Sequence, residues 1–172
     1  MDIIYSDKYT KLSYEEVKSL YHFVKSTSGD VLELGRLFGG STKIILSALK
    51  KDQSLTSVDL FNKPLKAFNK NEEYLLDKLS IITGDSNTVK FDKRFETVFI
   101  DTNHSYQNLS RDLKNCWDYV EKYFLFHDYR DATYEAEGVK KIVDYLISNK
   151  KLKLINLTRT LIITEKNAEN LF

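Results

Sequence analysis

Hydrophobic and polar positions along the chain follow two spacings, one typical of buried strands and one typical of amphipathic helices. Apolar runs of four to six residues are too short for helices and predict strands. Between these runs, apolar residues recur every three or four positions, as they do on the buried face of a helix. The predicted strands cover residues 31–34, 55–60, 80–83, 95–100, 123–126, 152–157 and 160–164.

The segments between the predicted strands carry helix signals. The stretch from Ser13 to Glu16 has the pattern of a capping box, and the residues after it place apolar side chains on one face. Ser41 is expected to cap a second helix, because a serine hydroxyl accepts hydrogen bonds from the free amides of a first helical turn. The other predicted helices cover residues 64–79, 105–120 and 138–147.

The order of these elements predicts the fold class. Strands and helices alternate through the first five strands, which is typical of an α/β fold with a mostly parallel sheet and helices on both faces. The last two of the seven strands are separated by only two residues and should form an antiparallel hairpin. We therefore expect one domain over residues 1–172, with an N-terminal helical cap at 1–28 and a core at 30–165.

Composition and charge limit the classes of partner. The chain has 26 Lys and Arg against 25 Asp and Glu, so it lacks the basic excess with which proteins bind nucleic-acid phosphates. It has no signal-peptide pattern and no apolar run near the roughly 20 residues that span a bilayer. Its single cysteine, Cys116, lies in an apolar series with helical spacing and is expected in the core. We therefore expect a cytoplasmic protein that binds neither nucleic acid nor a membrane.

A glycine-rich loop follows the first predicted strand. Gly35, Gly39 and Gly40 lie between this strand and the next helix, where the backbone of an open α/β sheet approaches its ligand. Their spacing lacks the tight first pair of the dinucleotide fingerprint, G-x-G-x-x-G. Glu33 precedes the loop, and its carboxylate would repel a pyrophosphate but suits a ligand that carries positive charge.

The stretch from Glu33 to Gly40 resembles the first motif of class I S-adenosylmethionine-dependent methyltransferases. The resemblance implies a Rossmann-like sheet and S-adenosylmethionine as cofactor, whose sulfonium and ammonium groups account for the acid. In this family an acid at the end of the second strand binds the ribose hydroxyls, and a loop after the third strand contacts adenine. The cofactor-binding residues that the resemblance implies are Glu33, Gly35, Gly39, Gly40, Ser41, Asp59, Leu60, Asp85, Ser86 and Asp101.

A second signature follows the fourth predicted strand. Residues 99–106, F-I-D-T-N-H-S-Y, resemble the I-D-G-D-H-S-Y signature of small methyltransferases related to macrocin-type sugar O-methyltransferases, a group with cephalosporin-hydroxylase-like members. The resemblance covers residues 30–165 and implies that Asp101, His127 and Asp128 bind a divalent cation. Carboxylate oxygens suit Mg²⁺, whereas His127 shifts the preference toward manganese, iron or zinc, or means that no metal binds.

His104 is the candidate general base, with Asp101 as the second catalytic residue. His104 lies three residues past Asp101 at the expected ligand edge. Its unperturbed pKa of about 6.5 suits proton removal from a substrate hydroxyl. A structural role at the start of the helix that begins at Ser105 stays open. The family's glycine and second acid are Thr102 and Asn103 here, which weakens the case for a metal more than the case for the cofactor.

These features predict an S-adenosylmethionine-dependent O-methyltransferase that acts on a hydroxyl of a small-molecule acceptor, a sugar or another vicinal diol, with Mg²⁺ or Mn²⁺ as an accessory ion. A non-catalytic S-adenosylmethionine-binding protein stays open as an alternative. So does an iron-dependent hydroxylase, whose metal ligands would come from Asp101, His104, His127 and Asp128. Because the chain has no long insertion, the acceptor pocket must come from the N-terminal helix, the loop around residues 129–137 or a partner subunit in a homodimer.

Overall fold

Seven strands form one sheet in the order β3-β2-β1-β4-β5-β7-β6. The computed structural model describes residues 9–130 and 137–171. β1 to β5 are parallel to one another, whereas β7 runs antiparallel to both β5 and β6. The predicted fold class, a mostly parallel Rossmann-like sheet with an antiparallel C-terminal pair, is confirmed. The strands are β1 (Val31–Leu34), β2 (Leu55–Asp59), β3 (Leu79–Thr83), β4 (Phe95–Ile100), β5 (Val120–Phe126), β6 (Leu152–Thr158) and β7 (Leu161–Lys166).

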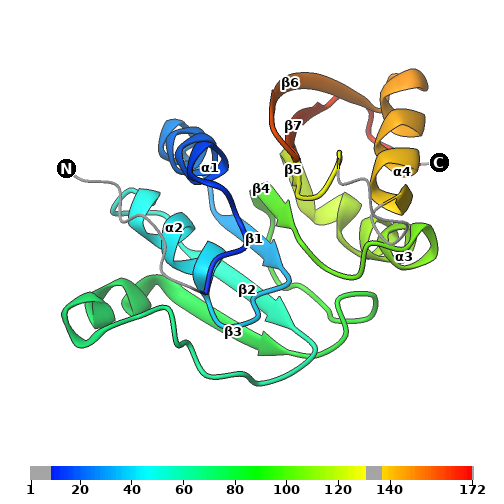
Figure 1. Cartoon of the computed structure of the whole chain (residues 1–172). Helices are drawn as coiled ribbons and strands as arrows, with labels where there is room; N and C mark the ends of the chain where they lie inside the picture. The colour runs from blue at the N-terminus through cyan, green and yellow to red at the C-terminus, as the bar shows by residue number, and fades with distance from the viewer. Residues whose placement is uncertain (1–8, 131–136, 172) are drawn as a thin grey trace.

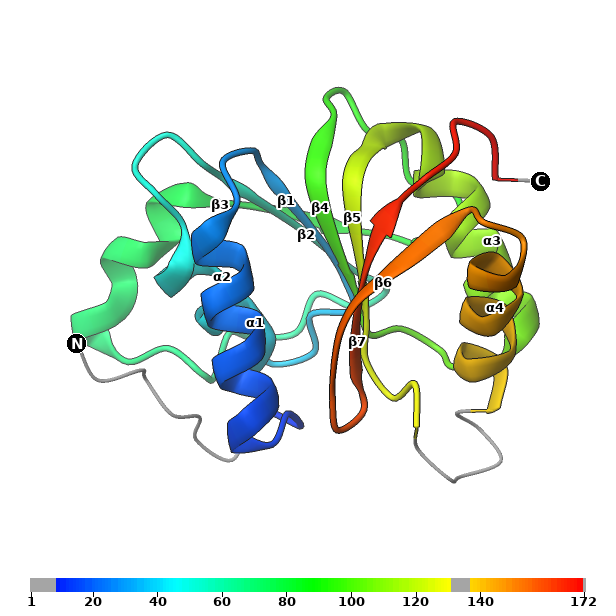
Figure 2. The same ribbon diagram turned by 90° about the horizontal axis from the view of Figure 1, so that it is seen from above.

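Helices cover both faces of the sheet (Figure 1). One face carries α1 (Tyr14–Ser26), α2 (Gly40–Ala48) and the 3₁₀ segment η1 (Lys70–Lys78). The other carries α3 (Tyr106–Cys116) and α4 (Glu137–Ser148), as Figure 2 shows. A short 3₁₀ turn, η2 (Trp117–Tyr119), joins α3 to β5. Each face has its own buried apolar cluster, and this explains why the central strands read as continuous apolar runs. In the described part of the chain, no helix is both long enough and apolar enough to cross a membrane.

The register of the parallel strands defines the functional edge of the sheet. Leu34 at the end of β1 pairs with Val58 of β2 on one side and with Ile100 of β4 on the other. Ile100 in turn pairs with Phe126 of β5. The carboxyl ends of these strands are therefore level, at the edge where open α/β sheets bind ligands. The residues that leave the sheet side by side at this edge are Gly35, Asp59, Asp101 and His127.

The start of α2 differs from the prediction. Its N-cap is Gly39, which has a left-handed φ of 87°, and no side chain caps the helix. Ser41 lies inside the first turn and donates its hydroxyl hydrogen to Oε1 of Glu33 at 2.6 Å. Because the helix already begins at Gly40, Ser41 is not at the N-cap position, where its hydroxyl oxygen could accept from the free amides of the first turn. The prediction that Ser41 caps this helix was wrong.

The predicted helix over residues 64–79 was also wrong. Only Lys70–Lys78 is helical there, and it forms 3₁₀ turns rather than an α-helix. Leu75 is its one buried residue, so no apolar stripe is present to hold a longer helix against the sheet. The predicted helix at 105–120 ends early, because α3 stops at Cys116 and β5 begins at Val120, three residues before its predicted start.

Candidate active site

A cavity of about 710 Å³ opens at the carboxyl-terminal edge of the sheet. Its volume is in the range of small-molecule sites. The loops after β1 to β5 form its wall together with residues 9–12 of the N-terminal segment. Glu33 and Gly39, two of the ten residues predicted to bind the cofactor, do not line it. The other eight do: Gly35, Gly40, Ser41, Asp59, Leu60, Asp85, Ser86 and Asp101.

Gly35 turns the chain as it leaves β1. Its φ is 95°, in the left-handed region, where side chains are strained. A Cβ at this position would lie 2.0 Å from the carbonyl oxygen of Asp101. Glycine therefore allows the loop and the end of β4 to meet, and the contact brings both to the cavity wall.

Glu33 lies beneath the glycine loop and is fully buried. It accepts hydrogen bonds from the hydroxyls of Ser41 and Thr42 in α2, at 2.6 and 2.7 Å, and from the hydroxyl of Ser57 in β2. Burial raises the pKa of this carboxyl group, against the effect of the three donors. Glu33 therefore holds α2 and β2 together under the loop, and its contact with the cofactor stays a prediction.

Asp59 fixes the loop from the cavity side. Its Oδ2 accepts hydrogen bonds from the backbone amides of Arg36 and Leu37, at 3.0 and 2.8 Å. Its Oδ1 accepts one from the amide of Phe61 at 2.9 Å. A carboxylate can accept about four hydrogen bonds, so Asp59 keeps capacity for a ligand hydroxyl while it orders the loop.

The loop after β3 forms a further part of the wall. Asp85 Oδ1 accepts hydrogen bonds from the backbone amide and the side-chain amide of Asn87, at 2.9 and 2.8 Å. Asn87 also donates to the side-chain oxygen of Asn108 in α3 at 3.1 Å. Leu60 adds an exposed apolar side chain to the cavity wall. The cavity therefore offers both polar and apolar surface.

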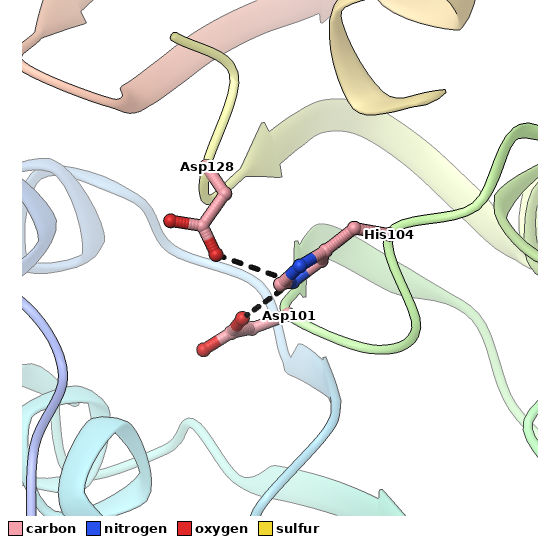
Figure 3. A group of neighbouring side chains, drawn as sticks. All are labelled: Asp101, His104 and Asp128. Carbon is pink, nitrogen blue, oxygen red and sulfur yellow. Dashed lines mark hydrogen bonds and ion pairs between the residues drawn. The ribbon is translucent and has the colours of Figure 1, made fainter. Parts of the chain in front are cut away.

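Asp101, His104 and Asp128 converge on the wall of the same cavity (Figure 3). His104 Nε2 lies 3.4 Å from Asp101 Oδ1 and 3.2 Å from Asp128 Oδ2. Asp101 follows β4 and Asp128 follows β5, while His104 comes from the loop that leads into α3. Asp128 has a φ of 58°, a left-handed conformation that is uncommon outside glycine and is enriched at functional sites. Ligand atoms of these three residues lie within 4.8 Å of one another, as a shared metal ion requires.

His127 lies beside this cluster and is 5% exposed. Its Nδ1 is 3.1 Å from Asp128 Oδ2 and 3.5 Å from Asp101 Oδ1. Neither contact has hydrogen-bond geometry, so Nδ1 is a buried nitrogen without a hydrogen-bond partner in the described residues. The other ring nitrogen, Nε2, lies 3.4 Å from Thr160 Oγ1 and 3.8 Å from Glu16 Oε2.

Opposite charges set the protonation of the cluster. Burial would raise the pKa of Asp101, but the imidazoles of His104 and His127 lower it to about 2. Burial would lower the pKa of His127, but the facing carboxylates of Asp101, Asp128 and Glu16 raise it to about 12. The contact with Asp101 raises the pKa of His104 as well. Without an ion, the imidazolium of His127 therefore balances the surrounding carboxylates at neutral pH.

The donor set fits a divalent cation. A buried nitrogen without a hydrogen-bond partner is unfavourable unless a cation lies against it, either a proton or a metal ion. Nδ1 of His127 is such an atom, and it faces the carboxylates of both Asp101 and Asp128. Two carboxylate oxygens and one imidazole nitrogen form a set that divalent first-row metals bind. The residues that the resemblance assigned to a metal are thus brought together.

Several residues of the site were not anticipated from the sequence. Tyr9 lines the cavity and packs its ring against Phe38 of the glycine loop, with centroids 6.0 Å apart. Arg36 is buried and donates from Nη1 to the carbonyl oxygen of Ser57 at 3.3 Å. The capping-box pattern gave Glu16 a helical role but no signal that it reaches His127. Residues 131–136 of the expected acceptor loop lie outside the described residues.

Comparisons with known proteins agree with this geometry. Residues 32–129 match the model of a family described as a methyltransferase domain. No curated protein sequence matches the chain.

Three solved structures share the fold at low sequence identity. An O-methyltransferase from Bacillus cereus, in complex with S-adenosylhomocysteine, is 16% identical, with a TM-score of 0.70 over 94% of this chain and 84% of its own. An O-methyltransferase from Streptomyces achromogenes involved in tomaymycin synthesis, in complex with S-adenosylmethionine, is 15% identical, with a TM-score of 0.62 over 91% and 82%. A TDP-rhamnose 3′-O-methyltransferase of calicheamicin biosynthesis is 13% identical, with a TM-score of 0.62 over 87% and 76%.

The family match spans more than half of the chain, including the glycine loop, Asp59, Asp101 and the Asp128 region. It assigns the enzyme class as a methyltransferase and gives no support to the iron-dependent hydroxylase. The chain belongs to the methyltransferase domain family and is a class I S-adenosylmethionine-dependent methyltransferase.

Proposed function

We propose that the protein transfers the methyl group of S-adenosylmethionine to a hydroxyl oxygen of a small polar acceptor, a sugar or another vicinal diol. The observation that carries this proposal is the position of His104, at the wall of the cavity and within 3.4 Å of two carboxylates. A base at this point is next to the space where a cofactor would present its methyl group. The sugar acceptor has a parallel in the TDP-rhamnose 3′-O-methyltransferase that shares the fold.

The cavity suits a positively charged cofactor. Four carboxylates line it, and they complement a ligand with sulfonium and ammonium groups: Asp59, Asp85, Asp101 and Asp128. Asp59 has acceptor capacity for the ribose hydroxyls, and the loop at Asp85 and Ser86 would contact adenine. Leu60 offers apolar surface to the adenine ring.

His104 lies between two hollows. Besides the main cavity, it lines a second one of about 570 Å³ that the amino-terminal ends of α3 and α4 form. Tyr106, Glu137 and Lys141 give this second hollow a polar wall, which suits a hydroxylated acceptor. An acceptor bound there would place its hydroxyl beside His104, and the cofactor would approach from the main cavity. Removal of the hydroxyl proton by such a base is worth about a hundred- to ten-thousand-fold in rate.

A divalent cation, Mg²⁺ or Mn²⁺, would be held by Asp101, His127 and Asp128. When bound, such an ion stabilises the negative charge that develops on an acceptor oxygen. The chain itself supplies the rest of the mechanism. The glycine loop and Asp59 fix the cofactor, and His104 receives the proton. Holding the two reactants in line can contribute roughly 7–11 kcal/mol to the lowering of the barrier.

The test is a transfer assay with the full chain. Methyl-labelled S-adenosylmethionine is incubated with a panel of sugars, sugar nucleotides and catechols, and both S-adenosylhomocysteine release and labelled product are measured. The proposal expects labelled O-methyl ethers, formed far more slowly by His104→Ala. Tight cofactor binding with no transfer to any acceptor would instead favour a non-catalytic binding protein, and label on nitrogen would overturn the oxygen acceptor.

A further inference from the structure

The carboxylate of Glu16 accepts more hydrogen bonds than a capping box requires. Its Oε2 accepts hydrogen bonds from the backbone amide and the hydroxyl of Ser13, both at 2.8 Å, and this completes the capping box of α1. Its Oε1 is turned the other way and accepts from the backbone amide and the hydroxyl of Thr160, at 2.8 and 2.6 Å. The side chain is nearly fully buried, between α1 and the turn that joins β6 to β7. A helix cap alone does not explain the second set of contacts.

The hydroxyl of Thr160 connects Glu16 to His127 and determines which ring nitrogen of His127 donates to it. Because this hydroxyl gives its hydrogen to Glu16, its oxygen is left as an acceptor for Nε2 of His127, 3.4 Å away. Nε2 therefore carries the ring hydrogen and donates it toward Thr160. Glu16 Oε2 lies 3.8 Å from the same nitrogen and favours the hydrogen there by its charge.

The hydrogen on Nε2 determines the role of the other ring nitrogen of His127, Nδ1. Because Nε2 keeps its hydrogen, Nδ1 is the nitrogen that can give up its proton to a metal ion, and it lies 3.1 Å from Asp128 Oδ2 and 3.5 Å from Asp101 Oδ1. Once that proton leaves, the nitrogen lone pair is repelled by the two carboxylate oxygens unless a metal ion takes the proton's place. In metal sites, the histidine ligands nearly always donate their second nitrogen to a carboxylate or to another fixed acceptor. The contacts from His127 to Thr160 and from Thr160 to Glu16 have this arrangement.

We infer that Glu16 is a positioning residue of the metal site: acting through Thr160, it holds His127 so that Nδ1 is a ligand, and the site prefers Mn²⁺ over Mg²⁺. The inference rests on the proposed function, because it concerns the ion expected at Asp101 and Asp128. Mg²⁺ favours sites made of oxygen ligands, whereas an imidazole nitrogen suits borderline ions such as Mn²⁺. A ring that is held in place before the ion arrives contributes this nitrogen without having to reorient.

The experiment compares ion binding in matched variants of the full chain. Mn²⁺ and Mg²⁺ are titrated by calorimetry into the wild type, Glu16→Gln and two controls. Glu15→Gln removes an exposed carboxylate of the same helix, which pairs only loosely with Arg159 at 3.8 Å. Ser13→Ala weakens the cap of α1 but leaves the contacts of Glu16 with Thr160 and His127.

We expect Mn²⁺ to bind the wild type at least tenfold more tightly than Mg²⁺. Glu16→Gln should weaken Mn²⁺ binding about ten- to a hundred-fold, and Mg²⁺ binding less. Both controls should stay within about twofold of the wild type.

Thr160→Val is the second variant, in case Glu16→Gln does not fold. It removes the bridging hydroxyl at similar volume and leaves every carboxylate of the site in place. Like Glu16→Gln, it should weaken Mn²⁺ binding. The visible spectrum of bound Co²⁺ serves as an independent readout, because it should change in Glu16→Gln and Thr160→Val but not in the controls.

Equal ion affinities in all variants would overturn the inference, and so would a wild type that binds no divalent ion at millimolar concentration. Titration with S-adenosylhomocysteine separates this failure from that of the proposed function. A wild type that binds S-adenosylhomocysteine but no ion leaves methyl transfer standing, with the proton of His127 as the only cation at the cluster.

Discussion

At the residue scale, the site depends on side chains that each make contacts in two directions. Asp59 holds the amides of the glycine loop and still faces the cavity. Its place at a strand end could be read from the sequence, because a carboxylate after an apolar run is a local signal. The partners of Glu33 could not, since Ser57 and Thr42 come from other elements. Spacing along a chain shows that a carboxylate is near a loop, but not which side of the loop it contacts.

The first prediction concerns His104, which is 29% exposed in its side chain and lines both hollows. His104→Ala should lower kcat for methyl transfer about a hundred- to ten-thousand-fold, because the acceptor proton then has no base. The affinities for S-adenosylhomocysteine and for Mn²⁺ should stay near those of the wild type, because the proposal places His104 on the acceptor side. Steady-state rates and calorimetry measure these quantities.

His22→Ala is the matched control, because His22 is an exposed histidine of α1, outside the cavity wall. It should behave like the wild type in both measurements. A His104→Ala enzyme with wild-type turnover would remove the general-base role. If the variant instead lost Mn²⁺, His104 would be a ligand of the ion, as its grouping with Asp101 and Asp128 allows.

At the scale of elements, strands were easier to predict than helices and helix ends. The buried strands form unbroken apolar runs because helices cover both of their faces, and such runs are visible in any sequence. The segment from Lys70 to Lys78 has helical composition, yet with Leu75 as its one buried side chain it forms only 3₁₀ turns. Its conformation depends on packing against the rest of the molecule, which a local pattern does not contain.

Gly138 is the residue at which α4 meets the loop that carries His104. A Cβ on Gly138 would lie 2.3 Å from the carbonyl oxygen of His104 and 2.3 Å from the amide nitrogen of Tyr106. Both are backbone atoms, so Gly138→Ala must move the helix or the loop. We expect a loss of about 1–3 kcal/mol in the free energy of unfolding, measured by urea denaturation. Methyl transfer should fall by a larger factor than cofactor affinity.

Ser148→Ala tests whether any change in α4 has the same effect, because Ser148 lies at the exposed end of the helix. Its stability and turnover should match the wild type. A Gly138→Ala variant as stable and as active as the wild type would mean that the close approach of α4 does not position His104.

At the scale of the whole molecule, the site joins parts of the chain that are far apart in sequence. Glu16 near the N-terminus contacts Thr160 near the C-terminus, and both lie against His127. The fold class, the ligand edge and most of the cavity wall followed from element order and from the residues at strand ends. The link between Glu16 and His127 did not, because it depends on how α1 and the β6–β7 turn meet over the end of β5. That meeting is a property of the folded chain and has no local signature.

A metal ion at the cluster should stabilise the whole fold by mass action. Millimolar Mn²⁺ should raise the melting temperature of the wild type, because an ion that binds only the folded state shifts the unfolding equilibrium. Asp128→Asn should lose this shift and keep the shift caused by S-adenosylhomocysteine. Asp118→Asn removes an exposed acid outside the cavity and should respond to Mn²⁺ as the wild type does. The same Mn²⁺ response in Asp128→Asn would place the ion elsewhere.

The central claim is that the cavity at the strand ends binds S-adenosylmethionine, and calorimetric titration with S-adenosylhomocysteine tests it most directly. We expect one molecule to bind per chain, and Asp59→Ala to weaken binding by about 1.5–3 kcal/mol while circular dichroism shows the fold retained. Asp52→Ala, which removes an exposed acid far from the cavity wall, should bind like the wild type. A wild-type protein that binds no S-adenosylhomocysteine, or an Asp59→Ala variant with unchanged affinity, would contradict this account.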